Sequence, residues 1–421
     1  MKPLHIGIAG PIATRDVAQW LDEPERMPSA MQASSLLATL IGELLSRGHR
    51  VSAFSLDASL EARADNIVCG TGGRFTMYCA PIRRRSIRTE GGVRGRILDL
   101  YALERAALVA AMRTASPDVV HAHWQYEYGW AAIDSGLPHV VTCHDAPWRV
   151  LRLMPNAYRL GRLLMARHVL RRARVVTAVS PYLAQAVRGM ASVEIDVVAN
   201  ALPCASPPLH RLPRHAPAPV RGARTVMILS GWGKLKNASL GLLAMRRLQQ
   251  LRPGTECHVV GPAFAKGQAG ALWIASQGWA QNFCSHGALT ASEVQALLQR
   301  MDLLIHPSLE ESFGMTVAEA MAHGIPVVAG VRSGGVAWVA GDGEAEGVAG
   351  RLVDVRSAVQ ISDAALALLD SPEEYKKCSV QGLARSRAMF SPQAVVDAYE
   401  GLYQRARHSA LGVSSPMPSA A

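Results

Sequence analysis

Short apolar runs that alternate with amphipathic stretches constrain this chain more than any other feature of its sequence. The first two runs are LHIGIAG and VSAFSL, and the amphipathic stretch SLLATLIGELLSRGH separates them. Four more runs follow in the first half: DVVHAHW, HVVTCHD, ARVVTAVS and IDVVAN. Apolar strands separated by helices are typical of a parallel sheet that is covered on both faces. The first half therefore predicts a doubly wound α/β domain.

A second series of the same kind occupies the other half. Its predicted strands are TVMILSG, ECHVVGP, NFCSHG, DLLIHPS and IPVVAG, with helices such as SLGLLAMRRLQQL and TASEVQALLQRM between them. The proline-dense stretch between the halves has no periodicity, which is typical of a linker. The prediction is a domain over 1–204, a linker over 205–222, a second domain over 223–390, a last helix over 391–408 and a disordered tail over 409–421. Two such Rossmann-like domains place a ligand cleft between them, at the carboxyl ends of the strands.

The composition describes a well-filled globular protein. Of the 421 residues, 49% are hydrophobic and 18% are charged, which does not fit a disordered chain. No apolar run reaches the roughly 18 residues that cross a bilayer, and the N-terminus MKPLHIGIAGP has no cleavage-site pattern. The seven cysteines are scattered, without a Cys-x-x-Cys pair. We expect a reduced, cytoplasmic protein without a structural metal.

Positive charge is concentrated in the first half. Residues 1–220 hold 26 Lys and Arg against 17 Asp and Glu, while residues 221–421 hold 18 against 16. Two basic stretches stand out, at 83–96 and 148–174. The stretch at 148–174 could dock on the inner face of an anionic membrane. The alternative is a solvated amphipathic helix whose apolar stripe faces the core. Nucleic acid is disfavoured as a partner, because aromatic residues make up only 5% of the chain and no recognised motif accompanies the arginines.

Two carboxylates flank a predicted loop-to-helix junction in the second half. Glu311 follows a strand, and Glu319 is expected in the first turn of the helix that ends near Gly324. Between them, the backbone N–H groups around Phe313, Gly314 and Met315 could hold a diphosphate at the helix N-terminus. Ionised carboxylates accept hydrogen bonds from sugar hydroxyls. The alternative is structural: Thr316 and Glu319 fit a capping box, and Glu311 could be a solvated loop charge.

The segment HPSLEESFGMTVAEAMAHGIPVVAG resembles the donor-site signature of the retaining family 4 glycosyltransferases, which have a GT-B fold. Their motif is two glutamates separated by seven residues, and here these are Glu311 and Glu319. The resemblance implies that Glu311 contacts hydroxyls of the donor sugar and that Glu319 contacts the ribose of the nucleotide. It also marks the intervening residues, Thr316 included, as donor-binding. Domain 1–204 would then face the acceptor, domain 223–390 the donor, and the last helix would cross back to the first domain.

A second candidate segment is LSGWGKLKN, in which Lys234 and Lys236 follow a strand end. Cations in such a turn suit a diphosphate. The family usually has an arginine about five residues before a lysine in this loop. Lys236 matches the lysine, but the arginine position falls on Gly231, or on Ser230 in a shifted alignment. Lys234 could substitute as a point charge without the bidentate geometry of arginine; the alternative is a pair of solvated lysines.

In the first half, VVTCHDAP places His144 and Asp145 after a strand, where the family carries a histidine that faces the cleft. A neutral imidazole can donate to a phosphate or a hydroxyl, and Asp145 could orient it. We assign His144 a positioning and electrostatic role in catalysis. His121 and His123 share one face of a strand, and packing is the expected role for such a pair. The sequence has no Asp-x-Asp motif, so metal-independent transfer without a further cofactor is expected.

Three more positions follow from the resemblance. The Gly-Gly pair that the family often has before its first helix is missing near Met31 and Gln32, which leaves the acceptor side unassigned. The family's Gly-Gly-x-Pro-Glu stretch ends here in Trp338 instead of a carboxylate. Gly287 matches the glycine of the loop that lies against the base.

The reaction that these residues predict is transfer of a hexose from a nucleotide-diphosphate sugar to a glycan or lipid-linked acceptor, with retention of configuration. Two alternatives remain open from the sequence. One is a nucleotide-sugar epimerase, which needs no acceptor. The other is a non-catalytic subunit that binds the donor, because the loop arginine and the Gly-Gly pair are missing.

Overall fold

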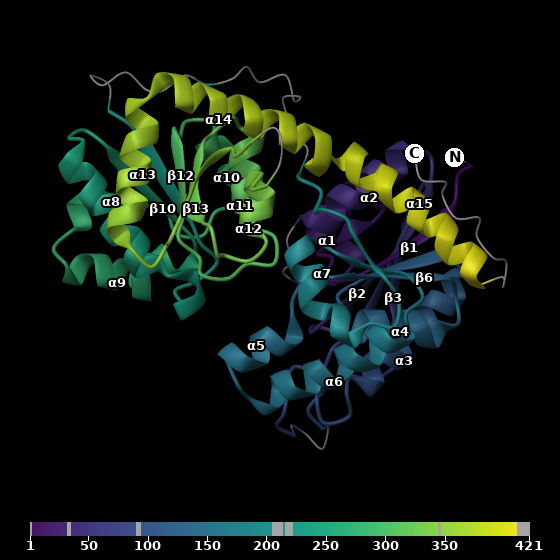
Figure 1. Ribbon diagram of the computed structural model, residues 1–421. Helices are drawn as coiled ribbons and strands as arrows, with labels where there is room; N and C mark the ends of the chain where they lie inside the picture. Colours follow the sequence, from purple (N-terminus) through teal and green to yellow (C-terminus); the bar gives the residue numbers. More distant parts are fainter. Residues whose placement is uncertain are drawn as a thin grey trace. The chain divides into compact units, whose positions relative to one another are not determined.

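The computed structural model describes residues 2–31, 35–89, 94–203, 214, 222–343 and 347–410. The chain forms two compact units. Unit 1 comprises Met1–Pro203 together with Pro392–Ala421, and unit 2 comprises Cys204–Ser391 (Figure 1). Most of the predicted linker, residue 32, residues 90–93 of the first basic stretch, and the tail from 411 lie outside the described residues.

Unit 1 is built on a sheet in the order β3-β4-β2-β1-β5-β6-β7-β8. Every neighbouring pair is parallel except β3 and β4, which are antiparallel. In the middle of the sheet, Ile6 lies opposite Val51 on one side and Val119 on the other. The strands are β1 His5–Ala9, β2 Arg50–Asp57, β3 Val68–Gly72, β4 Phe75–Pro81, β5 Val119–His123, β6 His139–Cys143, β7 Val176–Ala178 and β8 Ile195–Val197.

Helices cover both faces of this sheet, with α2 and α15 on one face and α3 and α4 on the other (Figure 1). The helices are α1 Thr14–Val17, α2 Leu36–Ser46, α3 Ala102–Ala115, α4 Glu127–Ser135, α5 Pro147–Leu153, α6 Ala157–Arg172, α7 Pro181–Val187 and α15 Pro392–Ala410. Asn156 caps α6 by accepting a hydrogen bond from the N–H of Arg159, and Ser180 caps α7 in the same way from Leu183.

The last helix, α15, completes the core of unit 1. Its Val396 and Tyr403 are fully buried in the same cluster as Ile41 of α2. At the rim of this contact, Arg47 Nη1 donates to Asp397 Oδ1 over 2.6 Å. The helix continues through residue 410, two residues beyond its predicted end at 408, so the predicted tail is wrong for residues 409 and 410.

Unit 2 contains a six-stranded sheet in the order β11-β10-β9-β12-β13-β14, in which all neighbours are parallel. Its strands are β9 Arg224–Ile228, β10 Glu256–Val260, β11 Phe283–Ser285, β12 Leu303–His306, β13 Val327–Gly330 and β14 Gly350–Val353. Its helices are α8 Ala238–Leu251, α9 Ala269–Ser276, α10 Ala291–Leu298, α11 Met315–Ala322, α12 Val336–Ala340, α13 Ala358–Asp370 and α14 Pro372–Arg385. Short 3₁₀ turns include η5 Lys234–Lys236 and η6 Pro262–Phe264, and a π-helical turn spans Ser386–Phe390.

The predicted α/β class with two doubly wound sheets is confirmed, but three strands were missed. β3 is a glycine-containing strand at the edge of its sheet, and β14 is an edge strand whose four residues are only partly buried. Neither has the apolar run that identified the other strands. The first four residues of β4 alternate between buried and half-buried, and its polar Thr76 interrupts the apolar run.

Both sheets reverse their strand order at one point, next to the first strand of each unit. In unit 1 this point lies between β1 and β5, and in unit 2 it lies between β9 and β12. In a parallel sheet the loops that follow the strands emerge at one edge, and ligands bind at this edge where the order reverses. The loops after β9 and β12 are therefore the first place to look for a site in unit 2.

Candidate functional site

An asparagine ties together the loops at the reversal point of unit 2. Asn237 follows η5 in a left-handed conformation with φ 51°. Its side-chain Nδ2 donates to the carbonyl oxygen of Pro307 over 3.1 Å and to that of Val355 over 2.7 Å. The turn that carries the two predicted lysines is thereby fixed against the end of β12 and the segment after β14.

The fixed turn brings two of the predicted residues together. Lys236 Nζ donates to Glu311 Oε1 over 2.6 Å, and both side chains are mostly buried, with 26% and 20% of their surface exposed. Burial alone would raise the pKa of Glu311, but His306 and Lys236 outweigh it and lower this pKa. Burial lowers the pKa of His306 to about 4, so its imidazole is neutral at pH 7. Lys234, on the same turn, is exposed.

The loop after Glu311 is held by backbone contacts. The carbonyl oxygen of Glu311 accepts a hydrogen bond from the N–H of Gly335 over 2.9 Å, and Glu311 forms an isolated parallel bridge with Gly334. Gly314 is the N-cap of α11 with φ 100°, a conformation that favours glycine. A Cβ atom at Gly314 would also lie 3.0 Å from Cγ2 of Val336. Glycine is therefore required here by both conformation and space.

Three N–H groups at the start of α11 are available to a ligand. Within the described part of the chain, the backbone N–H groups of Gly314, Met315 and Thr316 have no acceptor. The first N–H groups of any helix lack intrahelical acceptors and carry the positive end of the helix dipole. This edge of unit 2 therefore offers hydrogen-bond donors to an anion.

The capping-box alternative is wrong, and so is the predicted place of Glu319. The helix begins at Met315 because Gly314 is its N-cap, so Thr316 already lies inside the helix. The Thr316 hydroxyl lies 3.2 Å from Nδ1 of His306 and does not cap the helix. Glu319 is the fifth residue of α11 and lies beyond the first turn.

Glu319 is a half-buried carboxyl group with no hydrogen-bond or ion-pair partner among the described residues. Burial raises its pKa to about 7. A carboxyl group that is desolvated without compensation costs free energy, and such groups gather at functional sites. Glu319 is therefore available to a ligand, in contrast to Glu311, which already has a lysine partner.

The side chain of Phe313 belongs to the core and not to the site surface. It is only 3% exposed, and its ring packs edge-on against Phe390 and Trp338 at centroid distances of 5.4 Å and 6.3 Å. Arg385 lies beside the Trp338 ring at 5.5 Å from its centroid. The tryptophan that replaces a carboxylate of the family pattern thus packs within this aromatic cluster, and Phe313 can serve a ligand only through its backbone.

Two glycines shape the neighbouring loops after β10 and β11. Gly287 has φ 65°, and its carbonyl oxygen accepts a hydrogen bond from the N–H of Gly261 over 2.7 Å. Gly261 has φ 137°, and a Cβ atom there would lie 1.9 Å from the carbonyl oxygen of Leu229. Sequence reasoning named Gly287 but missed Gly261, although its place directly after a valine-rich strand was a signal.

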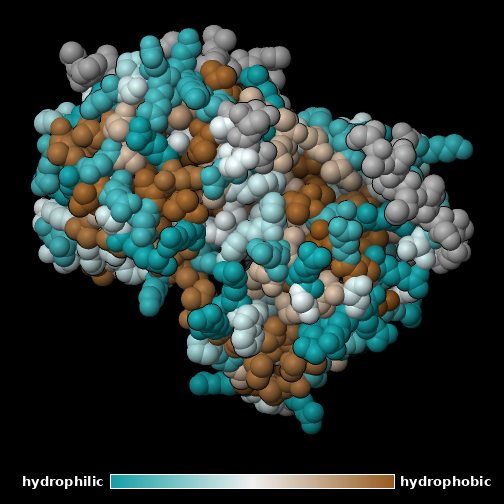
Figure 2. All heavy atoms as spheres, viewed as in Figure 1, coloured by the Kyte–Doolittle hydropathy of each residue, from teal (hydrophilic) through white to brown (hydrophobic). Residues whose placement is uncertain are grey.

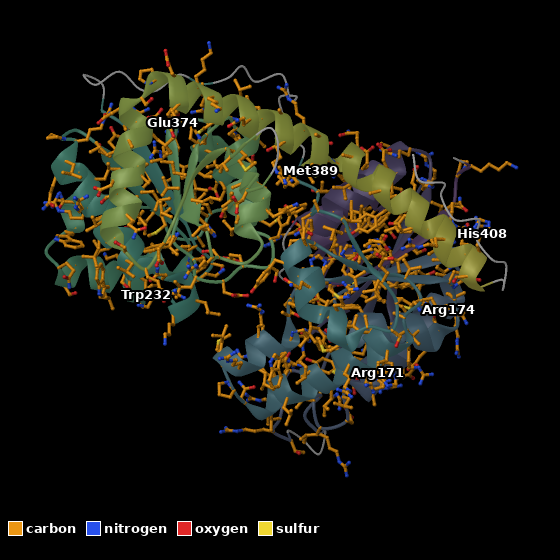
Figure 3. The ribbon with its side chains drawn as sticks, in the orientation of Figure 1. Arg171, Arg174, Trp232, Glu374, Met389 and His408 are labelled. Carbon is orange, nitrogen blue, oxygen red and sulfur yellow. The ribbon has the colours of Figure 1, made fainter. Side chains whose placement is uncertain are left out.

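Trp232 is a second residue of this edge that the sequence analysis left without a role. It lies in the loop after β9 and is labelled in Figure 3. Its ring centroid lies 6.2 Å from that of Phe264 in η6 and 5.8 Å from that of Trp273 in α9. A half-buried aromatic ring directly beside the lysine turn provides a flat apolar surface for a ligand ring.

In unit 1, His144 lies at the corresponding edge, after β6. Its Nε2 is 2.9 Å from Nδ1 of His123, and its ring stacks on Trp124 with a centroid distance of 4.3 Å. Burial lowers the pKa of His144 to about 3 and that of His123 well below its usual value. Both imidazoles are neutral at pH 7, as the role proposed for His144 requires.

The predicted orienting role of Asp145 is wrong. The Asp145 carboxylate accepts hydrogen bonds from Gln125 Nε2 and from the Tyr126 hydroxyl, over 2.9 Å and 2.5 Å. The group that orients His144 is instead His123, on the neighbouring strand. A contact across two strands cannot be read from residues adjacent in sequence.

His121 is held on both sides. Its Nδ1 lies 2.9 Å from the Tyr403 hydroxyl of α15, and its Nε2 lies 2.7 Å from Oγ1 of Thr142. The packing role expected for His121 agrees with these contacts. Through Tyr403, the C-terminal helix thus contacts the first of the three histidines.

Solved structures share this two-unit architecture. Sucrose-phosphate synthase from Thermosynechococcus elongatus aligns with a TM-score of 0.67 at 15% identity, covering 95% of this chain and 98% of that one. The Anabaena protein HepE, solved in complex with UDP and glucose, aligns with a TM-score of 0.63 at 16% identity, covering 96% of this chain and all of its own. The class of protein defined by these two doubly wound units is GT-B.

Two family models match adjacent parts of the sequence. The model described as Glycosyltransferase Family 4 matches residues 33–206, and the model described as Glycosyl transferases group 1 matches residues 219–385. The chain belongs to the family 4, group 1 glycosyltransferases.

Curated relatives are similar over parts of their length. The MMP alpha-(1->4)-mannosyltransferase of Mycolicibacterium hassiacum is 32% identical over 183 residues, which are 44% of this chain and 43% of the relative. The 2-deoxystreptamine glucosyltransferase of Streptomyces kanamyceticus is 26% identical over 262 residues, 56% of this chain and 67% of the relative. The chain thus spans less than half the length of the mannosyltransferase.

Proposed function

We propose that this chain transfers a hexose from a nucleotide-diphosphate sugar to a glycan or lipid-linked acceptor, with retention of configuration and without a metal. The observation that carries the proposal is the reversal point of unit 2. There the Lys236–Glu311 ion pair lies in the loops after β9 and β12. Among the described residues, the N–H groups of Gly314 to Thr316 at the start of α11 and the Glu319 carboxyl group within this helix have no partner. Cationic, anion-binding and hydroxyl-accepting groups are thereby collected at one sheet edge.

Each group has a distinct task in this proposal. The N–H groups at the start of α11 and the exposed Lys234 bind the diphosphate and stabilise the charge that develops on it as the sugar leaves. Glu311, kept ionised by Lys236, accepts hydrogen bonds from hydroxyls of the donor sugar. Glu319 accepts hydrogen bonds from the ribose. The backbone at Gly287 lies against the base.

In unit 1, neutral His144 offers a polar group to a ligand. Since its Nε2 is engaged by His123, the nitrogen that remains for a ligand is Nδ1. A neutral imidazole there can bind a phosphate or a hydroxyl without adding net charge. We assign it a positioning and electrostatic task, with no covalent intermediate.

The arginine that the family usually has before Lys236 is replaced by Gly231 or Ser230. Lys234 substitutes for it as a point charge, so the diphosphate is held with less geometric definition than a bidentate guanidinium would give. Together with the absence of Asp-x-Asp from the sequence, the N–H groups and the two lysines support charge stabilisation without a metal.

The decisive experiment is Glu311→Ala. A thermal-shift screen of UDP-, GDP-, ADP- and dTDP-sugars first identifies the donor, because a bound ligand stabilises the native state. With that donor, Glu311→Ala should abolish turnover while the melting temperature of the ligand-free protein stays within a few degrees of wild type. Glu373→Ala, an exposed glutamate on α14, is the control and should be fully active. Undiminished turnover in folded Glu311→Ala would refute the proposal.

Incubation with the donor alone separates the alternative activities. An epimerase would interconvert the sugar of the donor, whereas a transferase would hydrolyse it slowly. A non-catalytic donor-binding subunit would bind the donor tightly and show neither reaction with any acceptor in a panel. The missing loop arginine is the observation that favours this last alternative.

A further inference from the structure

The two basic stretches of the sequence lie side by side in unit 1. Ile97 packs against α6 at Gly161, where an added Cβ atom would lie only 2.5 Å from Cγ1 of Ile97. Nearby, the hydroxyl of Tyr101 lies 3.1 Å from that of Tyr158 at the start of α6. The segment around 94–101 therefore runs along α6, and α5 packs against α6 as well. Residues far apart in sequence thus form one surface.

Large apolar side chains are exposed on this surface. It holds seven of the fourteen large apolar side chains that are exposed in the described chain: Ile87, Leu98, Trp148, Leu153, Met154, Leu160 and Leu164. Figure 2 shows brown, apolar atoms over the end of unit 1 where Figure 1 places α6. Isolated exposed apolar residues need no explanation, but a cluster of this size marks an interaction site.

Helix α6 has apolar residues on two faces. Met165, Val169 and Leu170 are fully buried and form its core face. Leu160 and Leu164, one turn apart, are 49% and 52% exposed. The core therefore accounts for only one of the two apolar stripes, and the interpretation of 148–174 as a helix whose apolar stripe simply faces the core is incomplete.

The same surface is strongly basic. Residues 149–174 contain eight arginines, and the sequence has no Asp or Glu from residue 146 to residue 193. Arg162 is used internally, because it pairs with Glu127 over 3.0 Å and lies 3.5 Å from the centre of the Tyr126 ring. Arg152, Arg167 and Arg171 are exposed. Figure 3 labels Arg171 near the end of α6.

We propose that these exposed apolar residues and arginines, here called the α5–α6 surface, dock unit 1 on an anionic lipid membrane. Leucine and tryptophan side chains would enter the acyl boundary while the arginines pair with anionic headgroups, which is the arrangement of interfacial helices. No helix in the described residues is long and apolar enough to cross a membrane.

The charge distribution selects lipid over a second copy of the chain. In a two-fold symmetric dimer the same patch meets itself, so the arginines of one copy would face those of the other. Such like-charge contacts are unfavourable. An anionic bilayer offers both the apolar interior and the negative surface that the α5–α6 surface complements.

Docking also favours one of the two proposed acceptor classes, because a membrane-bound transferase meets lipid-linked acceptors in preference to soluble glycans. This choice between acceptors rests on the proposed transfer function. The docking itself does not, because it is a binding property of unit 1. Vesicle binding and donor turnover therefore succeed or fail independently.

The apolar part of the surface is tested by co-sedimentation of the full chain with vesicles. We expect binding to vesicles of phosphatidylcholine mixed with phosphatidylglycerol, and much weaker binding to phosphatidylcholine alone. The double variant Leu160→Ser, Leu164→Ser should bind the mixed vesicles at least roughly tenfold more weakly, because two exposed leucines no longer enter the bilayer. The matched control is Leu243→Ser, Leu272→Ser, which changes two exposed leucines of unit 2 and should bind as wild type.

The charged part is tested with Arg152→Gln, Arg167→Gln. Each arginine near an anionic surface is expected to contribute roughly fivefold, so the double variant should lose roughly 25-fold, and added salt should weaken wild type in the same direction. Arg300→Gln, Arg356→Gln changes two exposed arginines of unit 2 and is the control. Melting temperatures verify that each variant is folded.

Three results would overturn the proposal. The first is that wild type does not co-sediment with the mixed vesicles. The second is that it binds neutral and anionic vesicles equally, or that the unit 2 controls lose as much binding as the α5–α6 variants. The third is a dimer in sedimentation analysis that the Leu160→Ser, Leu164→Ser variant abolishes, which would assign the surface to a second copy.

Discussion

The two units share a strand order around their reversal points but place opposite electrostatics there. In unit 2 the edge carries a charged pair, Lys236 with Glu311, beside N–H groups at the start of α11 that have no acceptor among the described residues. In unit 1 it carries a row of neutral imidazoles, His121, His123 and His144, with ring centroids 4.1 Å and 5.2 Å apart along the row. In each unit the topology determines where a ligand can bind, and the side chains determine which chemical groups can be held there.

The two edges differ in how their buried ionisable side chains are stabilised. In unit 1, burial keeps the three imidazoles uncharged; His123 is hydrogen-bonded to His144, and His121 is hydrogen-bonded to Tyr403 and Thr142. In unit 2, a lysine compensates the buried charge of Glu311, while Glu319 is left without compensation. A diphosphate is therefore expected to be held by unit 2, and an uncharged or transferring group is expected near His144.

After Glu311→Ala, the largest effect on turnover is expected from removing the cation of unit 2. Lys236→Ala removes the hydrogen-bonded cation of Glu311, so the pKa of Glu311 should rise because Lys236 is one of the groups that lower it. We expect a loss of roughly 100- to 1,000-fold in kcat/KM, the range found when one preorganised charge-stabilising group is removed. Steady-state kinetics with the identified donor measure this. Lys377→Ala, on α14, is the control; equal kinetics for Lys236→Ala and wild type would contradict a charged donor edge.

The counterpart in unit 1 is His144→Gln. Glutamine keeps a polar group but cannot reproduce the imidazole that His123 orients, and we expect a loss of roughly 100-fold in kcat. Donor affinity should change little, because the donor groups lie in unit 2. His139→Gln changes a histidine at the opposite end of the same strand and should be neutral. If His144→Gln weakens donor binding and leaves kcat unchanged, the division of tasks between the units is wrong.

Tighter donor binding is expected when the missing arginine is restored in unit 2. A Cβ atom at Gly231 meets no atom within 4 Å, and Gly231 does not have a positive φ, so a larger residue fits there. Gly231→Arg restores the guanidinium that the family usually has and should lower KM for the donor by roughly tenfold, since bidentate charge-assisted bonds are the strong ones. Ser230→Arg tests the shifted alignment. No gain in either variant would mean that Lys234 already supplies what the arginine would.

The sequence predicted which residues lie at the two sheet edges better than it predicted their contacts. Glu311 and Lys236 were identified because each follows a buried strand, and parallel strands bring such loops to one edge. The position of Glu319 in its helix was wrong because it depends on where the helix begins, which the φ of Gly314 decides. The partner of His144 was missed because it lies 21 residues away, on the adjacent strand. Patterns along the chain locate strand ends, but hydrogen bonds between strands depend on side-chain directions that only the folded sheet defines.

The last prediction distinguishes the two carboxylates of unit 2 by their effect on stability instead of activity. Glu319 has a folded pKa of about 7 against a model-peptide value of 4.5. Between these values the folded protein keeps a proton that the unfolded chain has lost, so this residue lowers stability as pH rises from 4.5 to 7, and the loss is complete above pH 7. Glu319→Gln cannot ionise and should therefore melt higher than wild type at pH 8.

Glu311 should show the opposite sign. Its folded pKa is lowered, so its ionised form, paired with Lys236, stabilises the native state above the unfolded pKa, and this contribution fades as pH falls. Glu311→Gln should therefore melt lower than wild type at pH 8, with both differences shrinking towards pH 4. In a domain of this size each kcal/mol shifts the melting temperature by roughly 2 to 4 °C, which calorimetry resolves. If the melting temperatures of Glu311→Gln and Glu319→Gln shift in the same direction, the two carboxylates do not differ as proposed. In that case it would be wrong that Glu311 is compensated by a cation while Glu319 is uncompensated.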